Sequence, residues 1–417
     1  MPTNRVRLVW VAGAATIFAV AVPSRATAQA APLDTVELGF GIGPLPAVGR
    51  YADALRTVQR DGFRIIRAYE PFRASDHGFD RVLADLGVID SLGLVPYVGL
   101  SNFPYDLAPS ADVMAAAPGP RRLQMRRRQM FAATNRYPPN PDRYGAMLDD
   151  FLSALAARFG RPKLETWYFE IGNEPDAPVF FWGQPQDFRT LIQVAIARFH
   201  AFDPNLRIGG GAFTSGLVAH GTDKSADYVA VAQSLGSDAT AFVSAHIYAP
   251  SFPDATQIAP DLNRLFGPPG SQLRVVSEWN VDTKPTPNAH AIFMSTDAVV
   301  PYLIDMMAGA AEAGVRIVLV HKLMDDPAHE QLGYFDGSGK PKPAYAMVAM
   351  AGAFARQGFR VTHPDGGTLL AGDSLTYIHA GAQPVPFDPS RYSVVAPQGF
   401  QGSAVAPGAW AILRGQP

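Results

Sequence analysis

Two apolar runs of the sequence each lead to a glutamate. The first, WYFEIGNEPD (167–176), ends on an Asn-Glu-Pro sequence that contains Glu174, and the second, RVVSEWN (274–280), contains Glu278. Two carboxylates about 5 Å apart can cleave a sugar acetal, because one protonates the departing oxygen while the other stabilises or attacks the anomeric carbon. The pair predicts the chemistry of a retaining glycosidase, provided that the fold brings the two glutamates together.

Each glutamate also has a structural interpretation. Glu174 could cap the helix that follows its strand, since carboxylates favour helix N-termini. Glu278 could belong to a structural ion pair. The fold decides between these alternatives, because only a common site at the ends of both strands gives the pair a shared function.

The sequence alternates short β-rich runs with longer amphipathic helices. Eight strands are predicted, at 36–42, 63–69, 94–100, 166–172, 206–212, 241–248, 273–279 and 315–321. Helical periodicity is clearest at 142–159, 185–202, 297–314 and 342–357. Strands that are apolar on both faces and alternate with helices indicate an α/β fold with a parallel, helix-covered sheet.

Eight strand–helix units are the number that closes a (β/α)8 TIM barrel. An open doubly wound sheet is the alternative. Its Gly-rich first turn is only half present, because Gly39, Gly41 and Gly43 are followed by Pro44 and Pro46, which oppose a helix start there. In a barrel, the C-terminal ends of the fourth and seventh strands lie on roughly opposite sides of one bowl, where their glutamates can face each other.

After residue 357 the pattern changes to short strands separated by Gly, Pro and Asp turns. About sixty residues are few for an independent hydrophobic core. We therefore expect a catalytic barrel at 33–357 and a small β-rich segment at 358–417 that packs on its flank.

The two glutamate sequences, in this order and about a hundred residues apart, resemble clan A glycoside hydrolases, and within the clan family 39. That family includes β-xylosidases, α-L-iduronidases and exopolysaccharide hydrolases. Further similar stretches are GLVPYVGLSNFP, FVSAHIYAP and GYFDGSGKPKPAYAM. The resemblance implies that Glu174 is the acid/base and Glu278 the nucleophile of a hydrolase acting on a poly- or oligosaccharide without a cofactor.

The resemblance also implies roles for four polar residues. Asn173 would bind the sugar 2-hydroxyl, Tyr248 would keep the nucleophile ionised, and His246 would line the pocket on the same strand face as Tyr248. Arg67 would pair with Glu278 and depress its pKa. The structural alternatives are a core histidine at position 246 and a pairing of Arg67 with another acid such as Glu70.

Three aromatic residues, Phe103, Trp182 and Trp279, fall in or beside loops of the active face and could stack on sugar rings, although most aromatic residues are core. The sequence departs from the family at Gly172 and at His321-Lys322, two places where a Trp is usual. Lys322 could pair with the carboxylate of an acidic sugar, or it could point outward between strand and helix.

An insertion after the third strand (114–141) carries five arginines between 121 and 128. A solvated segment is the default interpretation. The alternative is a basic rim that attracts an anionic polysaccharide, since charge at a cleft mouth raises the local substrate concentration.

The first 28 residues combine arginines, an apolar run and Ala-Thr-Ala, the order of a cleaved secretory signal, with an uncleaved anchor as alternative. The formal net charge of −2 becomes about −5 without them, which argues against a nucleic-acid partner. No later run is long and apolar enough to span a bilayer, so no stable membrane insertion is expected after signal cleavage. The chain has no cysteine and no metal-binding or Gly-x-Ser-x-Gly sequence motif.

These observations predict an exported glycoside hydrolase, in the periplasm or the medium. Two alternatives remain: a barrel that binds exopolysaccharide without cleaving it, and a clan A glycosidase of another family. Sugar, linkage and endo or exo action depend on loops and not on the fold.

Overall fold

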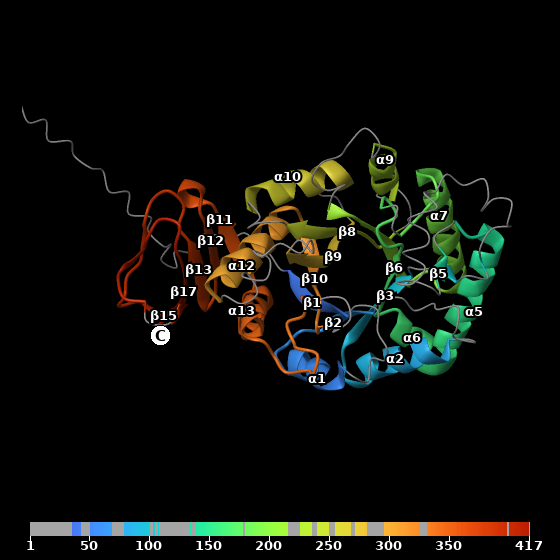
Figure 1. Ribbon diagram of the computed structural model, residues 1–417, viewed down its shortest axis with the longest axis horizontal. Coiled ribbons are helices and arrows are strands. Elements are labelled where there is room, and N and C mark those ends of the chain that lie inside the picture. The colour runs from blue at the N-terminus through green and yellow to red at the C-terminus, as the bar shows by residue number, and fades with distance from the viewer. Residues whose placement is uncertain are drawn as a thin grey trace, which may run out of the picture.

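A computed structural model describes residues 36–42, 51–68, 79–100, 103–104, 107, 134–135, 138–177, 180–215, 226–235, 240–249, 255–267, 272–281, 296–325, 332–397 and 400–416 of the chain. Its centre is a closed barrel of parallel strands in the order β1-β10-β9-β8-β7-β6-β3-β2 (Figure 1). The first strand pairs with the last, Gly41 opposite His321, which rules out an open sheet. The predicted barrel is confirmed.

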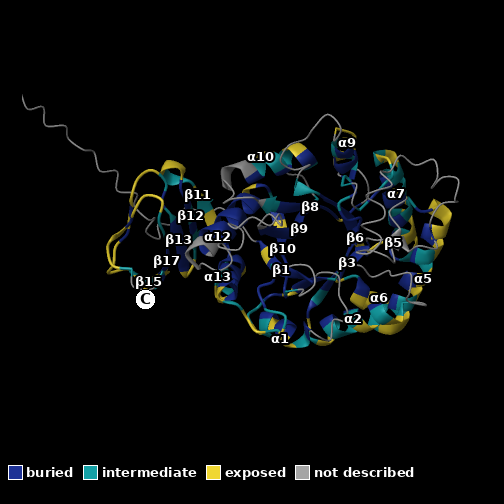
Figure 2. Ribbon diagram, viewed as in Figure 1, coloured by how far each residue is buried: buried dark blue, intermediate teal, exposed yellow. Residues whose placement is uncertain are grey.

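The barrel strands lie where the sequence predicted them, with ends shifted by two residues or fewer. They are β1 (Glu37–Ile42), β2 (Ile65–Ala68), β3 (Val95–Leu100), β6 (Tyr168–Ile171), β7 (Arg207–Phe213), β8 (Phe242–Ala249), β9 (Leu273–Val281) and β10 (Val315–His321). Figure 2 shows them as the most buried part of the molecule.

Helices cover the outside of the barrel. They are α1 (Ala52–Arg60), α2 (Asp80–Ser91), α5 (Pro141–Phe159), α6 (Arg161–Leu164), α7 (Pro185–Phe202), α9 (Ala226–Leu235), α10 (Ala255–Phe266), α12 (Thr296–Glu312) and α13 (Pro343–Gln357). Local signals set the helix starts: the Asn140 side chain accepts hydrogen bonds from the N–H groups of Asp142 and Arg143, and Pro141 occupies the first turn.

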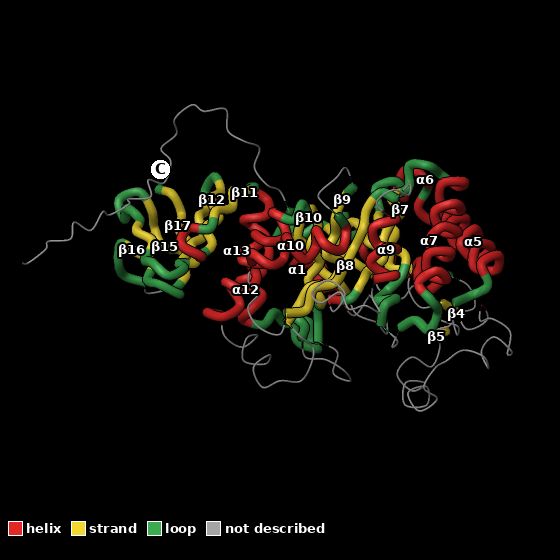
Figure 3. The backbone as a smooth tube through the Cα atoms, turned by 90° about the horizontal axis from the view of Figure 1, so that it is seen from above, coloured by secondary structure: helices red, strands yellow, loops and turns green. Residues whose placement is uncertain are grey.

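The segment after α13 forms a five-stranded antiparallel sheet in the order β11-β12-β13-β17-β15. Its strands are β11 (Phe359–Thr362), β12 (Thr368–Gly372), β13 (Leu375–His379), β15 (Tyr392–Ala396) and β17 (Trp410–Gly415), and a ribbon of β14 (Val385–Pro386) and β16 (Ala404–Val405) accompanies them. Figure 3 shows this sheet beyond α12 and α13, apart from the barrel strands. The predicted C-terminal β-rich extension is confirmed.

The two faces of this sheet belong to different apolar clusters. Leu370, Tyr377 and Ile412 join the main core that surrounds the barrel, whereas Ile378 and Leu413 belong to a separate cluster with β14 and β16. The sheet therefore packs on the barrel and also completes a small core of its own, which its length alone did not lead us to expect.

Several predictions from the sequence fall outside the described residues. These include the signal sequence, the arginines of 121–128 and Glu70. The backbone forms a short pair of strands, β4 (Phe103–Pro104) before the insertion of 114–141 and β5 (Thr134–Asn135) within it. Among the described residues, no helix has the length and hydropathy that crossing a bilayer requires.

Candidate active site

The interior of the barrel changes character along the strands. At the N-terminal end it is filled by the apolar side chains of Ile65, Tyr97, Phe242, Val275, Ile317 and Leu319. Toward the C-terminal end the buried side chains become charged, and they come from β2, β6, β8 and β9. This is the end at which (β/α)8 enzymes carry their active sites.

Glu278 lies in the middle of this charged group. Its carboxylate accepts hydrogen bonds from Arg67 Nη1 at 2.6 Å and from the Tyr248 hydroxyl at 2.5 Å. Burial alone raises the pKa of Glu278, but the charges of His246, His321 and Arg67 and the Tyr248 hydrogen bond outweigh it, so that the pKa lies well below its usual value. Glu278 is thus held as a carboxylate, the form that a nucleophile needs.

Arg67 connects Glu278 to two further groups. Its Nε donates to Glu170 at 2.7 Å and its Nη2 donates to the side-chain oxygen of Asn173 at 3.2 Å. The Arg67 side chain is 1 % exposed and that of Glu170 is fully buried. The hydrogen bond to Asn173 fixes the orientation of the amide, so that its N–H₂ group points away from Arg67 and is available to another acceptor.

Glu174 lies directly beyond β6 in a left-handed backbone conformation, with φ of 47°. Its N–H donates to the carbonyl of Ala212 at 2.9 Å, and Ala212 is itself left-handed, with φ of 43°. Such conformations are costly for residues with a side chain and gather at functional sites. The preceding Gly172 has φ of 90°, and a Cβ there would approach the Phe188 ring to 2.6 Å, so the usual Trp has no room at this position.

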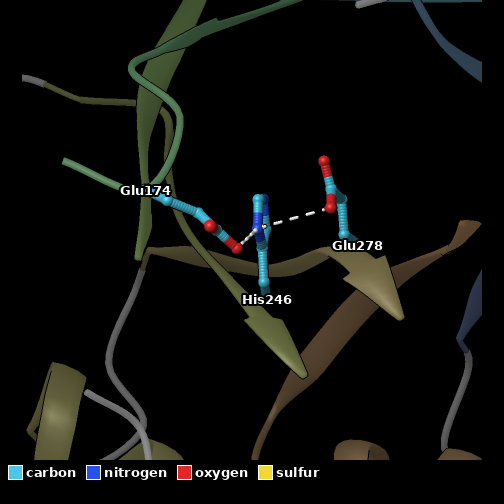
Figure 4. A group of neighbouring side chains, drawn as sticks. All are labelled: Glu174, His246 and Glu278. Atoms are coloured by element: carbon cyan, nitrogen blue, oxygen red, sulfur yellow. Dashed lines mark hydrogen bonds and ion pairs between the residues drawn. The ribbon is translucent and has the colours of Figure 1, made fainter. Parts of the chain in front are cut away.

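His246 joins the two glutamates. Its Nδ1 lies 2.9 Å from Glu174 Oε1 and 3.5 Å from Glu278 Oε2 (Figure 4). A carboxylate oxygen of each glutamate and a ring nitrogen of His246 all lie within 4.8 Å of one another. Burial lowers the pKa of His246, whereas the two glutamates raise it, and the net effect is upward. The side chain is therefore held by the two glutamates and is not a passive core histidine.

The spacing of these three side chains admits two kinds of chemistry. Two carboxylates this close fit the separation in retaining glycosidases. Two carboxylates and an imidazole can also ligate a divalent cation. The guanidinium of Arg67, 2.6 Å from Glu278, opposes a second positive charge at that place, so the group suits acid/base and nucleophilic chemistry better than metal binding.

The prediction for Trp279 is wrong. Its side chain is 1 % exposed and stacks on Tyr302 of α12, with ring centroids 5.4 Å apart. A β-bulge in β9 shifts the register between Val276 and Glu278, so that Glu278 faces the interior and the next residue faces the helices. Trp279 anchors a helix to the barrel and does not contact the site.

The remaining predicted residues are Trp182, Lys322 and Phe103, and the structure places each by the element that carries it. Trp182 is partly exposed in the segment between β6 and α7. Lys322 directly follows β10 and is buried, and His321 has its ring centroid 6.3 Å from that of Tyr248. The backbone of Phe103 lies in β4, and its side chain is outside the described part.

Sequence reasoning missed Glu170 and Tyr97. The Tyr97 hydroxyl donates to Glu170 at 2.8 Å, on the side of the carboxylate away from Arg67. A signal existed: Glu170 is a charged residue inside an apolar strand, and its register neighbours on β3 and β7 are Gly99 and Gly209. Glycines on both sides leave space inside the barrel for a long polar side chain.

The closed parallel barrel with a Glu-His-Glu group at the C-terminal strand ends defines the class of clan A glycoside hydrolase-like barrels. The sequence model of glycosyl hydrolases family 39 matches residues 106–350, more than half of the chain, and the chain therefore belongs to this family.

Individual proteins similar to this chain share a low sequence identity with it. A β-xylosidase of Caldicellulosiruptor saccharolyticus is 27 % identical over 123 residues, which cover 29 % of this chain and only 22 % of that protein. Among solved structures, a monomeric β-xylosidase from Caulobacter crescentus superposes with a TM-score of 0.61 at 18 % identity, covering 90 % of this chain and 77 % of that one. A family 39 enzyme from Xanthomonas axonopodis pv. citri gives 0.61 at 17 % identity, with 90 % and 75 % covered.

Proposed function

We propose that the protein is a retaining glycoside hydrolase that cleaves O-glycosidic bonds of a poly- or oligosaccharide through Glu278 and Glu174. The observation that carries the proposal is the geometry of the pair. Arg67 and Tyr248 hold Glu278 ionised. Glu174 lies within hydrogen-bond distance of His246, which stands between the two glutamates. Family membership supports the same reaction class.

In the first step, a Glu278 oxygen attacks the anomeric carbon while the bond to the leaving oxygen breaks, and Glu174 transfers its proton to that oxygen. In the second step, Glu174 takes a proton from water, the water oxygen attacks the anomeric carbon, and Glu278 is released as a carboxylate. Asn173, oriented by Arg67, offers its N–H₂ group to the sugar 2-hydroxyl, a contact that strengthens as charge develops at the anomeric centre.

The substrate class follows from two features. The similarity to β-xylosidases makes aryl β-xylosides the first substrates to test. The buried residues His321 and Lys322 at the end of β10, in place of the family's Trp, make acidic sugars the second, because a lysine can pair with a sugar carboxylate. The experiment is a panel of aryl β-xylosides, β-xylans, uronic-acid polymers and bacterial exopolysaccharides, assayed for new reducing ends with wild type and Glu278→Gln.

Release by wild type and not by the variant supports the proposal, and NMR detection of a product with the anomeric configuration of the substrate identifies the retaining mechanism. A covalent adduct on Glu278 after treatment with an activated 2-deoxy-2-fluoro glycoside would identify the nucleophile by mass spectrometry. Binding to a polysaccharide without release, equal in both proteins, would instead favour a non-catalytic polysaccharide-binding barrel.

We further propose that the chain is exported. The support is the order of charged, apolar and small residues in the first 28 positions. N-terminal sequencing of the protein recovered from the periplasm or medium should begin at Gln29, and retention of the full-length chain in the membrane fraction would indicate the uncleaved anchor.

A further inference from the structure

A third carboxyl group lies two residues beyond the acid/base. Asp176 is partly buried, and its side chain accepts a hydrogen bond from the N–H of Thr214 at 3.0 Å and another from the Thr214 hydroxyl. Thr214 directly follows β7. Asp176 therefore connects the turn after β6, which carries Glu174, to the turn after β7.

This connection lies beside two strained residues, one in the turn after β6 and one near the end of β7. Glu174 and Ala212 are both left-handed, and they are joined by the hydrogen bond from the Glu174 N–H to the Ala212 carbonyl. The Ala212 N–H donates in turn to the hydroxyl of Ser244 in β8 at 3.0 Å. A non-glycine residue stays in this conformation only where its surroundings fix it. Asp176 and Thr214 add two further bonds between the segments that follow β6 and β7.

We propose that Asp176 is a positioning residue for the acid/base, which holds the turn of Glu174 in place through its two hydrogen bonds from Thr214. The proposal rests on the proposed function of Glu174. It assigns to these two bonds the conformation in which the Glu174 carboxyl reaches the leaving oxygen.

Two variants test these bonds. Asp176→Ala removes both of them, and Thr214→Val removes the hydroxyl bond alone while keeping the shape of the Thr214 side chain. Asp149→Ala on the outer helix α5, where Asp149 pairs with Arg198, is the matched control for loss of one carboxylate. Each protein is assayed on the best substrate of the panel described above, as two aryl glycosides, one with a good and one with a poor leaving group.

For Asp176→Ala we expect kcat/KM for the poor leaving group to fall about tenfold, because that substrate depends on proton donation by a correctly placed Glu174, and kcat/KM for the good leaving group to change little. Thr214→Val, which loses one of the two bonds, should show the same difference between the substrates at a smaller size. Asp149→Ala should match wild type.

Equal leaving-group dependence of kcat/KM in Asp176→Ala and wild type would overturn the proposal. If Asp176→Ala does not fold, as judged by circular dichroism, Thr214→Val carries the test, and an unchanged kcat/KM for the poor leaving group would overturn it. Wild type that cleaves no glycoside would refute the proposed function itself, an outcome distinct from both.

Discussion

The two ends of the barrel interior are built from the same strands but in opposite ways. At the N-terminal end, the interior is an apolar layer in which Ile317, Val275 and Phe242 meet without charge. Further along the strands, Arg67, Glu170 and Glu278 form a buried chain of charge-assisted hydrogen bonds. Tyr97 marks the boundary, since its ring belongs to the apolar layer and its hydroxyl binds Glu170.

The difference assigns stability to the residues at the N-terminal ends of the strands and chemistry to the residues at their C-terminal ends. Apolar layers stabilise by burial and tolerate changes that keep volume. Buried ion pairs contribute little net stability, because desolvation offsets attraction, yet removal of one partner is costly. We therefore expect substitutions in the charged layer to affect catalysis first, and substitutions in the apolar layer to affect stability alone.

The largest effect is expected for Glu170→Gln. The variant leaves Arg67 with one carboxylate partner in place of two, so that Arg67 can turn away from Asn173 and Glu278. We expect kcat/KM to fall about 100-fold or more, equivalent to roughly 3 kcal/mol of transition-state stabilisation. Steady-state kinetics on the best aryl glycoside checks this expectation.

Tyr97→Phe is the matched control, because it removes only the other hydrogen bond of Glu170 and should cost about 1 kcal/mol of stability with a smaller loss of activity. Wild-type kcat/KM in Glu170→Gln would show that Arg67 keeps its place without Glu170.

The apolar layer should respond in the opposite way. Ile317→Ala removes a 2 % exposed side chain from the N-terminal end of the barrel and should lower the free energy of unfolding by about 2–4 kcal/mol. The kcat at 25 °C should stay within about twofold of wild type, because the charged layer above it is unchanged.

Urea denaturation and kinetics on the same preparations measure both quantities, and Ile317→Leu, which keeps the volume, should lose less than about 1.5 kcal/mol. A tenfold fall in kcat for Ile317→Ala would mean that the two layers are coupled and not separate.

The sequence predicted the strands well because their apolar runs are continuous and bounded by turn residues, as at 36–42 and 315–321. It could not predict which residues meet across the barrel. Arg67 lies 103 positions from Glu170 and 211 from Glu278, and only closure of the barrel brings them together.

The error at Trp279 has a local physical cause. Val275 faces the interior, so strict alternation would also place residue 279 inside, but the bulge around Ser277 reverses the sequence of faces. A bulge depends on the pairing of both neighbouring strands, and no residue type in this stretch signals it. The same bulge turns Glu278 inward. The periodicity of the sequence therefore could not show the feature that orients the candidate nucleophile.

The smallest expected effect lies outside the barrel, at the contact between the C-terminal sheet and α12. Two histidines meet carboxylates there. His379 Nδ1 lies 2.7 Å from Asp305 Oδ2, and His363 Nε2 lies 3.0 Å from Glu312 Oε1. The hydrogen bond that the His379 ring donates to Asp305 is the main cause of the raised pKa of His379. In His363 burial lowers the pKa, but the bonds to Glu312 and to the carbonyl of Gly367 raise it overall.

Because both pKa values are higher in the folded protein, the two pairs contribute stability that is complete below the unfolded-state value of about 6.5 and is lost as the pH rises through the folded-state values. Both pairs are partly exposed, unlike His246, so the loss should be no more than about 1 kcal/mol in total. Urea denaturation between pH 5.5 and 8.5 should show it, and the double variant His363→Asn/His379→Asn should lack this component. A variant with the pH dependence of wild type would show that the apolar contacts of Leu370, Tyr377 and Ile412 hold the sheet on the barrel by themselves.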